Sequence, residues 1–146
     1  MKLSENRFDT LVADFPDDRT LYPNSMVVVS DSLLFYNTSN ATVEVRNGKV
    51  KLLGIHPQLP GLKHLTYDSR GWLWATGERG SVVYQDEKQI FLEDQPSFSG
   101  SGAFVSYEDR LGRTWVGSDG GGLLRFLGYS FKSYGSGTTL ESSGVF

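Results

Sequence analysis

The chain has 146 residues, of which 38% are hydrophobic and 13% aromatic, a composition typical of a protein with a packed core and not of bulk disorder. The formal net charge is -3 and Lys and Arg are scattered, so we expect no nucleic-acid partner. There is no cysteine, which excludes disulfides and thiolate chemistry but fits reducing and oxidising compartments alike.

We expect no membrane segment in this chain. No apolar run approaches the roughly 18 residues that cross a bilayer. The first ten residues, MKLSENRFDT, also lack the apolar core of a signal peptide.

Short apolar runs bounded by turn residues follow one another along the chain and predict β-strands. We expect a linker over residues 7–25, strands over 26–54, 62–94 and 103–135, and a truncated linker over 136–146. In the second group the runs LKHLTYD, WLWATG, SVVYQD and QIFLED predict a four-stranded antiparallel meander. No window has apolar residues at helical spacing, so helix should be nearly absent.

The strand groups are repeats of one another. At a constant shift of 41 the residues Asp68, Gly71, Trp74, Gly80 and Val82 align with Asp109, Gly112, Trp115, Gly121 and Leu123. A diverged copy lies upstream at a shift of 39, and TLYPNSMV aligns with TLESSGVF at a shift of 119. Four-stranded units that recur about every 40 residues are typical of propeller blades. The predicted fold class is therefore all-β, a β-propeller fragment of about three four-stranded antiparallel blades.

Six repeated residues are expected to have structural roles: Asp68, Gly71, Trp74, Asp109, Gly112 and Trp115. Each Trp fills the gap to the next blade, so its truncation to Ala should cost about 3–5 kcal/mol. The recurring Asp suits a cap of the D-x-x-G turn better than acid/base catalysis, because a catalytic carboxylate is needed only once.

The repeat also points to a family. D-x-x-G-x-x-W followed by a Gly-containing turn, as in DSRGWLW with GERG and DRLGRTW with SDGGG, resembles the two-component regulator propeller repeat. The segment FPDDRTLYPNS is similar to that family's linker between blades, whereas the first blade departs from the motif by lacking both Gly and Trp. The resemblance implies a periplasmic or extracytoplasmic sensor domain of hybrid histidine kinases or similar regulators, responding to carbohydrate or other small molecules.

The residues give no support for an enzyme. His56 and His64 are the only histidines, and no carboxylate accompanies them at a metal-ligand spacing, so we expect no metal, no cofactor and no catalytic residue. The Gly120-Gly121-Gly122 run joins two predicted strands and opens no helix, which favours a β-turn over a phosphate cradle.

Propeller ligands bind over the channel, at the turns between strands two and three and at the linkers. The ligand-binding candidates are Glu78, Arg79, Ser118 and Asp119 in turns and Tyr22 and His56 in linkers, with Thr38 to Asn40 and Phe98 beside them. We expect a ligand-sensing module of a signal-transduction sensor, with a small-molecule or oligosaccharide ligand. The alternative is a protein-binding or structural scaffold without such a ligand, and an enzyme of the propeller lyase or quinoprotein kind comes third.

Three blades do not close a ring, since propellers have 4 to 8. The two outer blades would then expose apolar faces that solubility does not tolerate. Two arrangements are open: the chain forms a homo-oligomer, or these faces pack against further blades of a longer protein.

Overall fold

A computed structural model of the chain describes residues 23–58, 61–92, 102–118, 121–128 and 130–134. Apart from a 3-10 turn at Leu92, the regular elements within these ranges are all β-strands, which confirms the all-β prediction. No helix in the described ranges is long and apolar enough to span a membrane.

The first four strands form one antiparallel sheet, which we call blade one. They are β1 (Ser25–Ser30), β2 (Leu33–Asn37), β3 (Ala41–Arg46) and β4 (Lys49–Ile55), paired in chain order. Asn47 and Gly48 join β3 to β4 with φ angles of 52° and 73°, the left-handed pair that a two-residue hairpin requires. Blade one is therefore a simple meander.

The next two groups are also meanders. Blade two consists of β5 (Leu62–Tyr67), β6 (Leu73–Gly77), β7 (Val82–Gln85) and β8 (Lys88–Phe91). Blade three consists of β9 (Ala103–Glu108), β10 (Thr114–Ser118), β11 (Gly122–Phe126) and β12 (Phe131–Tyr134). A single backbone pair between Gly77 and Ala103 links β6 to β9, so blades two and three share one continuous sheet.

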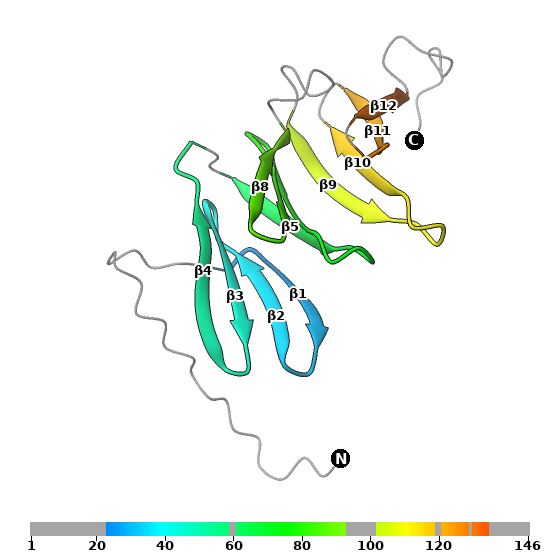
Figure 1. Ribbon diagram of the computed structural model, residues 1–146. Coiled ribbons are helices and arrows are strands. Elements are labelled where there is room, and N and C mark those ends of the chain that lie inside the picture. Colours follow the sequence, from blue (N-terminus) through cyan, green and yellow to red (C-terminus); the bar gives the residue numbers. More distant parts are fainter. Residues whose placement is uncertain (1–22, 59–60, 93–101, 119–120, 129, 135–146) are drawn as a thin grey trace.

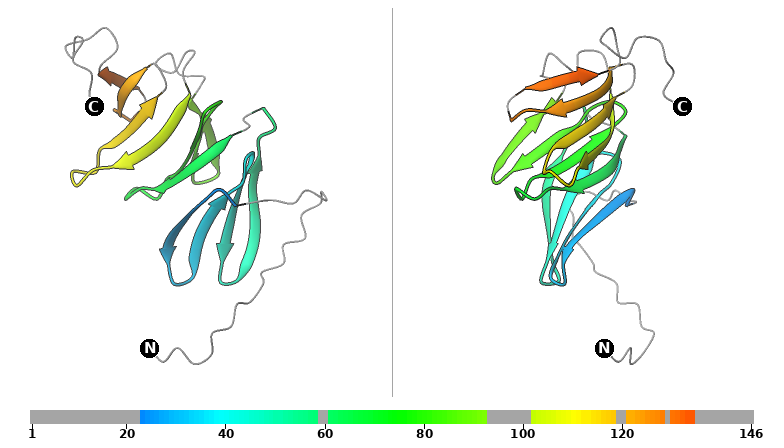
Figure 2. Two further views of the ribbon diagram at one scale, coloured as in Figure 1. Left: turned by 180° about the vertical axis from the view of Figure 1, so that it is seen from behind. Right: turned by 90° about the vertical axis from the view of Figure 1, so that its right-hand side faces the viewer.

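The three blades follow one another through space in chain order, from blue and cyan through green to orange (Figures 1 and 2). Their first strands are neighbours, since β5 contacts both β1 and β9. The Leu65 amide donates to Ser25 Oγ at 3.2 Å, and Thr66 Oγ1 donates to the Ser106 carbonyl at 2.8 Å. The first strands thus lie side by side, as around the axis of a propeller.

Each blade has two faces, because side chains alternate along a strand. The preceding face looks toward the blade before it in the chain, and the following face looks toward the next blade. The following face of blade one packs on the preceding face of blade two, where Phe35 of blade one meets a buried set from blade two: Leu62, Leu65, Leu73, Ala75, Val82 and Tyr84. Phe35 stacks on Tyr67 with ring centroids 5.5 Å apart.

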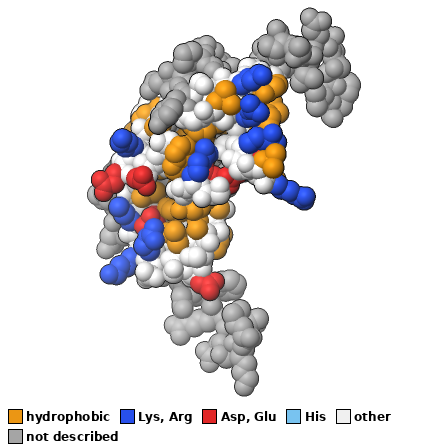
Figure 3. Space-filling view, turned by 45° about the vertical axis from the view of Figure 1, so that its right-hand side comes forward, with side chains coloured by type: hydrophobic (Ala, Val, Ile, Leu, Met, Phe, Trp, Pro, Cys, Tyr) orange, Lys and Arg blue, Asp and Glu red, His pale blue; other side chains and the backbone are white. Residues whose placement is uncertain are grey.

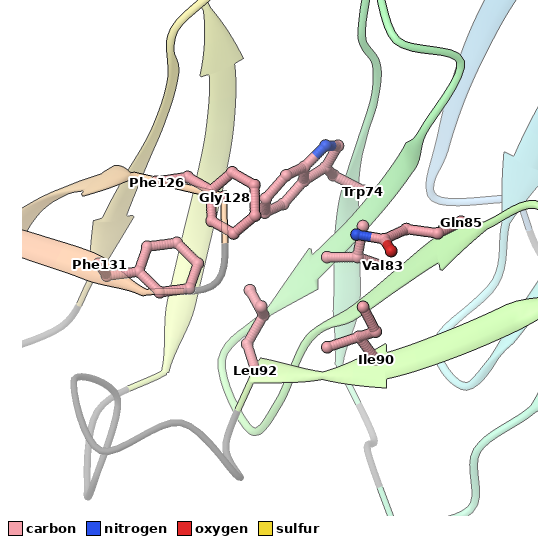
Figure 4. Close-up of a pocket in the computed structure, with 8 residues that line it drawn as sticks. All are labelled: Trp74, Val83, Gln85, Ile90, Leu92, Phe126, Gly128 and Phe131. Atoms are coloured by element: carbon pink, nitrogen blue, oxygen red, sulfur yellow. The ribbon is translucent and has the colours of Figure 1, made fainter.

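The contact between blades two and three is built on Trp74. This side chain is fully buried, and its ring meets Phe126 edge to face at 5.3 Å. An apolar cavity of about 100 Å³ lies beside it, between Trp74, Val83, Ile90 and Leu92 of blade two and Phe126 and Phe131 of blade three (Figure 4). The cavity shows which side chains of the two faces oppose one another.

The strand pairing corrects the alignment of the third strand. Ala75 pairs with Val82 in blade two, and the equivalent Val116 pairs with Leu124 in blade three, so the shift is 41 up to β10 and 42 from β11 onward. The hairpin between β10 and β11 holds one residue more than its counterpart. Because one residue reverses the face of every side chain, Leu124 is fully buried and Leu123 is 44% exposed.

The structure also separates the two tryptophans, which the sequence treats as equivalent. Trp74 is covered by blade three, whereas Trp115 lies on the following face of blade three and is only half-buried among the described residues. The large cost of truncation therefore applies to Trp74 and not to Trp115, because Trp115 has less buried area to lose.

Candidate functional site

The D-x-x-G turns show why Asp precedes Gly in both good repeats. The Asp68 carboxylate accepts the Arg70 and Trp72 amides at 3.0 and 2.9 Å through Oδ1. It also accepts the Trp74 indole Nε1 at 2.9 Å through Oδ2. Gly71 takes the left-handed φ of 84° that closes the turn. One carboxylate thus holds the turn and orients the indole.

Asp109 makes the same set of bonds one repeat later. Its Oδ1 accepts the Leu111 and Arg113 amides at 2.9 and 3.0 Å, and its Oδ2 accepts Trp115 Nε1 at 2.9 Å. Desolvation raises the pKa of Asp109, but the hydrogen bonds from Trp115, Arg113 and Leu111 outweigh it and hold the pKa well below its usual range. Both carboxylates are occupied by their own turn, an arrangement that serves structure.

The candidate ligand residues are best described by the surface to which they belong. We call turn face the surface formed by the β2–β3, β6–β7 and β10–β11 turns together with the starts of β5 and β9. The β6–β7 turn is closed by Gly80, whose amide donates to the Gly77 carbonyl at 3.4 Å. Its backbone lies directly against blade three, since a Cβ on Gly102 would be only 2.0 Å from the Glu78 carbonyl oxygen. The turn face is thus continuous from blade two to blade three.

Glu78 and Arg79 project from this turn into solvent. Glu78 forms an ion pair with Lys63, and both side chains are about half exposed. The hydrogen bond and charge of Lys63 lower the pKa of Glu78. Arg79 is exposed beside them. The turn face therefore presents one carboxylate, Glu78, and two cations. Arg79 is next to Glu78 in the sequence, and Lys63 forms the ion pair with it.

Sequence reasoning missed two residues of this surface, Lys63 and Phe104. Both lie in a β-bulge at the start of the first strand of their blade, where Leu62 and His64 pair with successive residues of β6, and Ala103 and Val105 with successive residues of β10. A bulge re-aims the extra side chain, and the Phe104 ring is 41% exposed. The shift of 41 that relates Lys63 to Phe104 was available as a signal, but the bulge itself has no signature in these residues.

Thr38 to Asn40 form the β2–β3 turn and connect to blade two mainly through their backbone. The Ser39 carbonyl accepts the amides of Gly61 and Leu62 at 2.7 and 3.0 Å. Thr38 is buried, and its hydroxyl accepts the Ala41 amide at 3.1 Å. Ser39 alone in this turn is exposed, so the turn contributes little side-chain chemistry.

His56 lies between blades one and two and not at the surface. It is 3% exposed, its Nε2 is 2.8 Å from Tyr84 Oη, and its ring meets Phe91 edge to face at 5.4 Å. Burial lowers the pKa of His56 and raises that of Tyr84 to about 12, so both groups are neutral at physiological pH. This position gives His56 a packing role, and the structure brings it to no other candidate.

Ser118 donates from Oγ to the Gly122 carbonyl at 3.1 Å within the β10–β11 hairpin. Asp119, Tyr22 and Phe98 lie outside the described residues. Among the residues that are described, no group of three His, Asp or Glu side chains is placed to hold a metal ion. Of the candidates that lie within the described residues, the structure therefore brings together Glu78 and Arg79 and no other pair.

No family model and no curated protein matches the chain. Several solved structures are similar to the chain in fold. The chain is similar to the extracellular domain of BT4673 from B. thetaiotaomicron, described as a one-component system, with a TM-score of 0.66 and 13% identity over 93% of this chain and 18% of that one. The chain is also similar to the extracellular domain of BT3049 from the same organism, described as a hybrid two-component system. The TM-score is 0.62 and the identity 21%, over 84% of this chain and 17% of that one.

A third similar structure is virginiamycin B lyase from Staphylococcus aureus, with a TM-score of 0.64 and 16% identity over 83% of this chain and 43% of that one. The chain thus spans less than half of the lyase and about a sixth of the two extracellular domains. Identities this low show the fold alone. The described strands therefore form part of a β-propeller, and its structural neighbours include extracellular domains of two-component systems.

Proposed function

We propose that the chain is the ligand-sensing part of an extracytoplasmic signalling propeller and that it binds carbohydrate at the turn face. The observation that carries the proposal is the composition of that face. Phe104, whose ring is 41% exposed, comes directly after Ala103, which pairs with Gly77, and its backbone therefore lies near Glu78 and the ion-pair partner Lys63, with Arg79 next in the turn. Binding sites that orient a small ligand combine apolar walls with a few placed polar groups.

A sugar ring suits this combination chemically. Its C–H face is apolar and packs on an aromatic ring, while its hydroxyls accept from Lys63 and Arg79 and donate to Glu78. The likeness in fold to the extracellular domains of a one-component system and of a hybrid two-component system supports a signalling role. The likeness in fold to a lyase shows that the fold also accommodates catalysis.

A thermal-shift screen of neutral and acidic oligosaccharides tests the proposal. A ligand at 100 times its dissociation constant stabilises the folded state by about 2.7 kcal/mol, which corresponds to roughly 5–10 °C in melting temperature for a domain of this size. We expect one sugar class to produce such a rise, and calorimetry to give the affinity.

Single substitutions test whether the ligand binds at the turn face. Arg79→Ala and Phe104→Ala should each weaken binding at least tenfold, whereas Lys88→Ala, which removes an exposed cation from β8, should leave the affinity unchanged. A ligand whose affinity is indifferent to Arg79 and Phe104 would move the site elsewhere. If no sugar in the screen raises the melting temperature, the result would favour a protein-binding scaffold.

A further inference from the structure

The cavity between blades two and three has apolar walls. It is lined by the side chains of Trp74, Val83, Ile90 and Leu92 from blade two and Phe126 and Phe131 from blade three, with Gln85 and Gly128 beside them. None of these described residues is charged. On the outer surface, by contrast, apolar side chains are interspersed with Lys and Arg over the upper part of the molecule (Figure 3). The cavity therefore differs in chemistry both from that surface and from the charged turn face.

The cavity is closed on the side of the turn face and open on the other side. Trp74 and Leu92 are buried, and the Leu92 amide donates to the Ser81 carbonyl at 3.0 Å, next to the β6–β7 turn. Gln85 and Gly128 are partly exposed. Gln85 ends β7 and Gly128 follows β11, so both lie away from the turns that form the turn face. A small molecule can therefore enter past these two residues without separating the blades and without reaching the turn face.

Two residues outside the lining hold the aromatic walls in place. Trp74 Nε1 donates to Asp68 Oδ2 at 2.9 Å, which fixes the indole. The Phe126 ring lies 5.3 Å from that of Trp74 and 5.1 Å from that of Phe131, between centroids. It also meets Trp72 edge to face at 5.8 Å. Because side chains around a void relax only partially into it, walls fixed in this way keep the cavity open.

The closed end of the cavity suits an apolar occupant better than water. A buried water makes two to four hydrogen bonds, and Gln85 is the one polar side chain of the described lining. Apolar cavities of roughly 150 Å³ stay dry and take up benzene. This cavity measures about 100 Å³ and opens to solvent at one end, so it accommodates a single ring whose substituent lies in the mouth. Such a ring leaves water and gains contacts with the walls.

Gln85 adds a polar group at the mouth. In Figure 4 its amide points toward the space that Trp74 and Leu92 also face. A primary amide both donates and accepts hydrogen bonds. A hydroxyl group on the ring can therefore bond to Gln85 while the ring itself stays among the apolar walls.

We propose that this cavity binds a small molecule that has one aromatic ring and one hydroxyl group. The ring packs among Trp74, Phe126 and Phe131, since offset and edge-to-face contacts between aromatic rings are favourable. The hydroxyl group forms a hydrogen bond with the Gln85 amide. The site is separate from the turn face, so this inference does not depend on the proposed binding of carbohydrate there.

Titration of the wild-type chain with phenol, followed by NMR, tests the proposal. The methyl resonances of Val83, Ile90 and Leu92 should shift and then saturate, because an aromatic ring changes the local field beside it. The methyl resonances of Ile55 in blade one should not shift. We expect a dissociation constant of about 1 mM, within the range that a ligand of this size reaches. Cavity methyl shifts that fail to saturate by about 10 mM phenol would overturn the proposal, as would saturable shifts confined to residues outside the cavity.

Ile90→Phe adds a ring to the wall of the cavity and should weaken phenol binding at least tenfold. The matched control is Ile55→Phe, the same change at a residue of β4 that is 43% exposed, and it should leave the affinity unchanged. Thermal unfolding of each variant confirms that it is folded, and the wild-type titration decides the question even where Ile90→Phe fails to fold. Equal affinity of the folded Ile90→Phe variant and the wild-type chain would place phenol elsewhere and overturn the proposal.

Gln85→Leu tests the polar contact. It should lower the affinity for phenol relative to that for benzene about threefold to tenfold, which is the usual effect of one hydrogen bond. Gln89→Leu, at an exposed residue of β8, should leave this ratio unchanged. A ratio that Gln85→Leu does not alter would refute the assigned role of Gln85 and with it the hydroxyl specificity of the site.

Discussion

Trp74→Ala and Trp115→Ala form a pair of substitutions that tests the blade interface directly. A fully buried aromatic side chain removes roughly 150–250 Å² from water, which at about 25 cal/mol per Å² is worth roughly 4–6 kcal/mol. Trp74 is completely buried, and it also donates to Asp68, whose side chain is itself buried. We therefore expect Trp74→Ala to lower the free energy of unfolding by about 3–5 kcal/mol.

Trp115 makes the same indole bond to Asp109, but from a partly exposed position. Its truncation should cost about 1–2 kcal/mol, as for most substitutions outside the core. Urea denaturation followed by circular dichroism gives both values, provided that the slope of the transition is unchanged. Equal losses in the two variants would refute the reasoning, because they would show that blade three does not shield Trp74 or that Trp115 is equally covered.

Three further predictions concern single residues. Gly77→Ala should cost about 1–3 kcal/mol in urea denaturation, because its new methyl group would lie 2.2 Å from the Gly61 carbonyl oxygen. Burial lowers the pKa of both histidines, so their contribution to stability is complete above the unfolded pKa of about 6.5 and is lost as the pH falls. His56→Gln should therefore reduce the loss of stability between pH 7.5 and 5.5, with His64→Gln as the comparison. The folded pKa of Asp109 is depressed, so its contribution is complete above about pH 4 and is lost in stronger acid. Asp109→Asn should flatten the unfolding free energy against pH in that range, and an unchanged slope would contradict the hydrogen-bond geometry.

The repeat made the fold predictable from the sequence. Asp68 and Trp74 recur as Asp109 and Trp115, and both pairs turn out to be joined by an indole hydrogen bond. Such motifs can be recognised in a sequence because a local hydrogen bond requires particular residue types at a fixed spacing. Blade one, which lacks the motif, still places Phe35 where the later blades have Trp.

The candidate site was less predictable, because it depends on register and burial. The glycine run between β10 and β11 gives no sign of which residue is the extra one, so Leu123 was aligned where Leu124 belongs. The bulges that re-aim Lys63 and Phe104 are set by strand pairing. His56 comes directly after a strand, in a linker where surface residues are expected. Its ring nevertheless lies against Tyr84 and Phe91 of the next blade.

The extra residue in the β10–β11 hairpin has a consequence for how this blade tolerates mutation. Removing one codon between Ser118 and Gly122 would leave every side chain of β11 and β12 chemically unchanged but turned to the opposite face. Arg125 would then point into blade two, and Leu124 would point to solvent. Blade three should accept many single substitutions on its open face. A deletion of three nucleotides in its glycine-rich turn, by contrast, should unfold it.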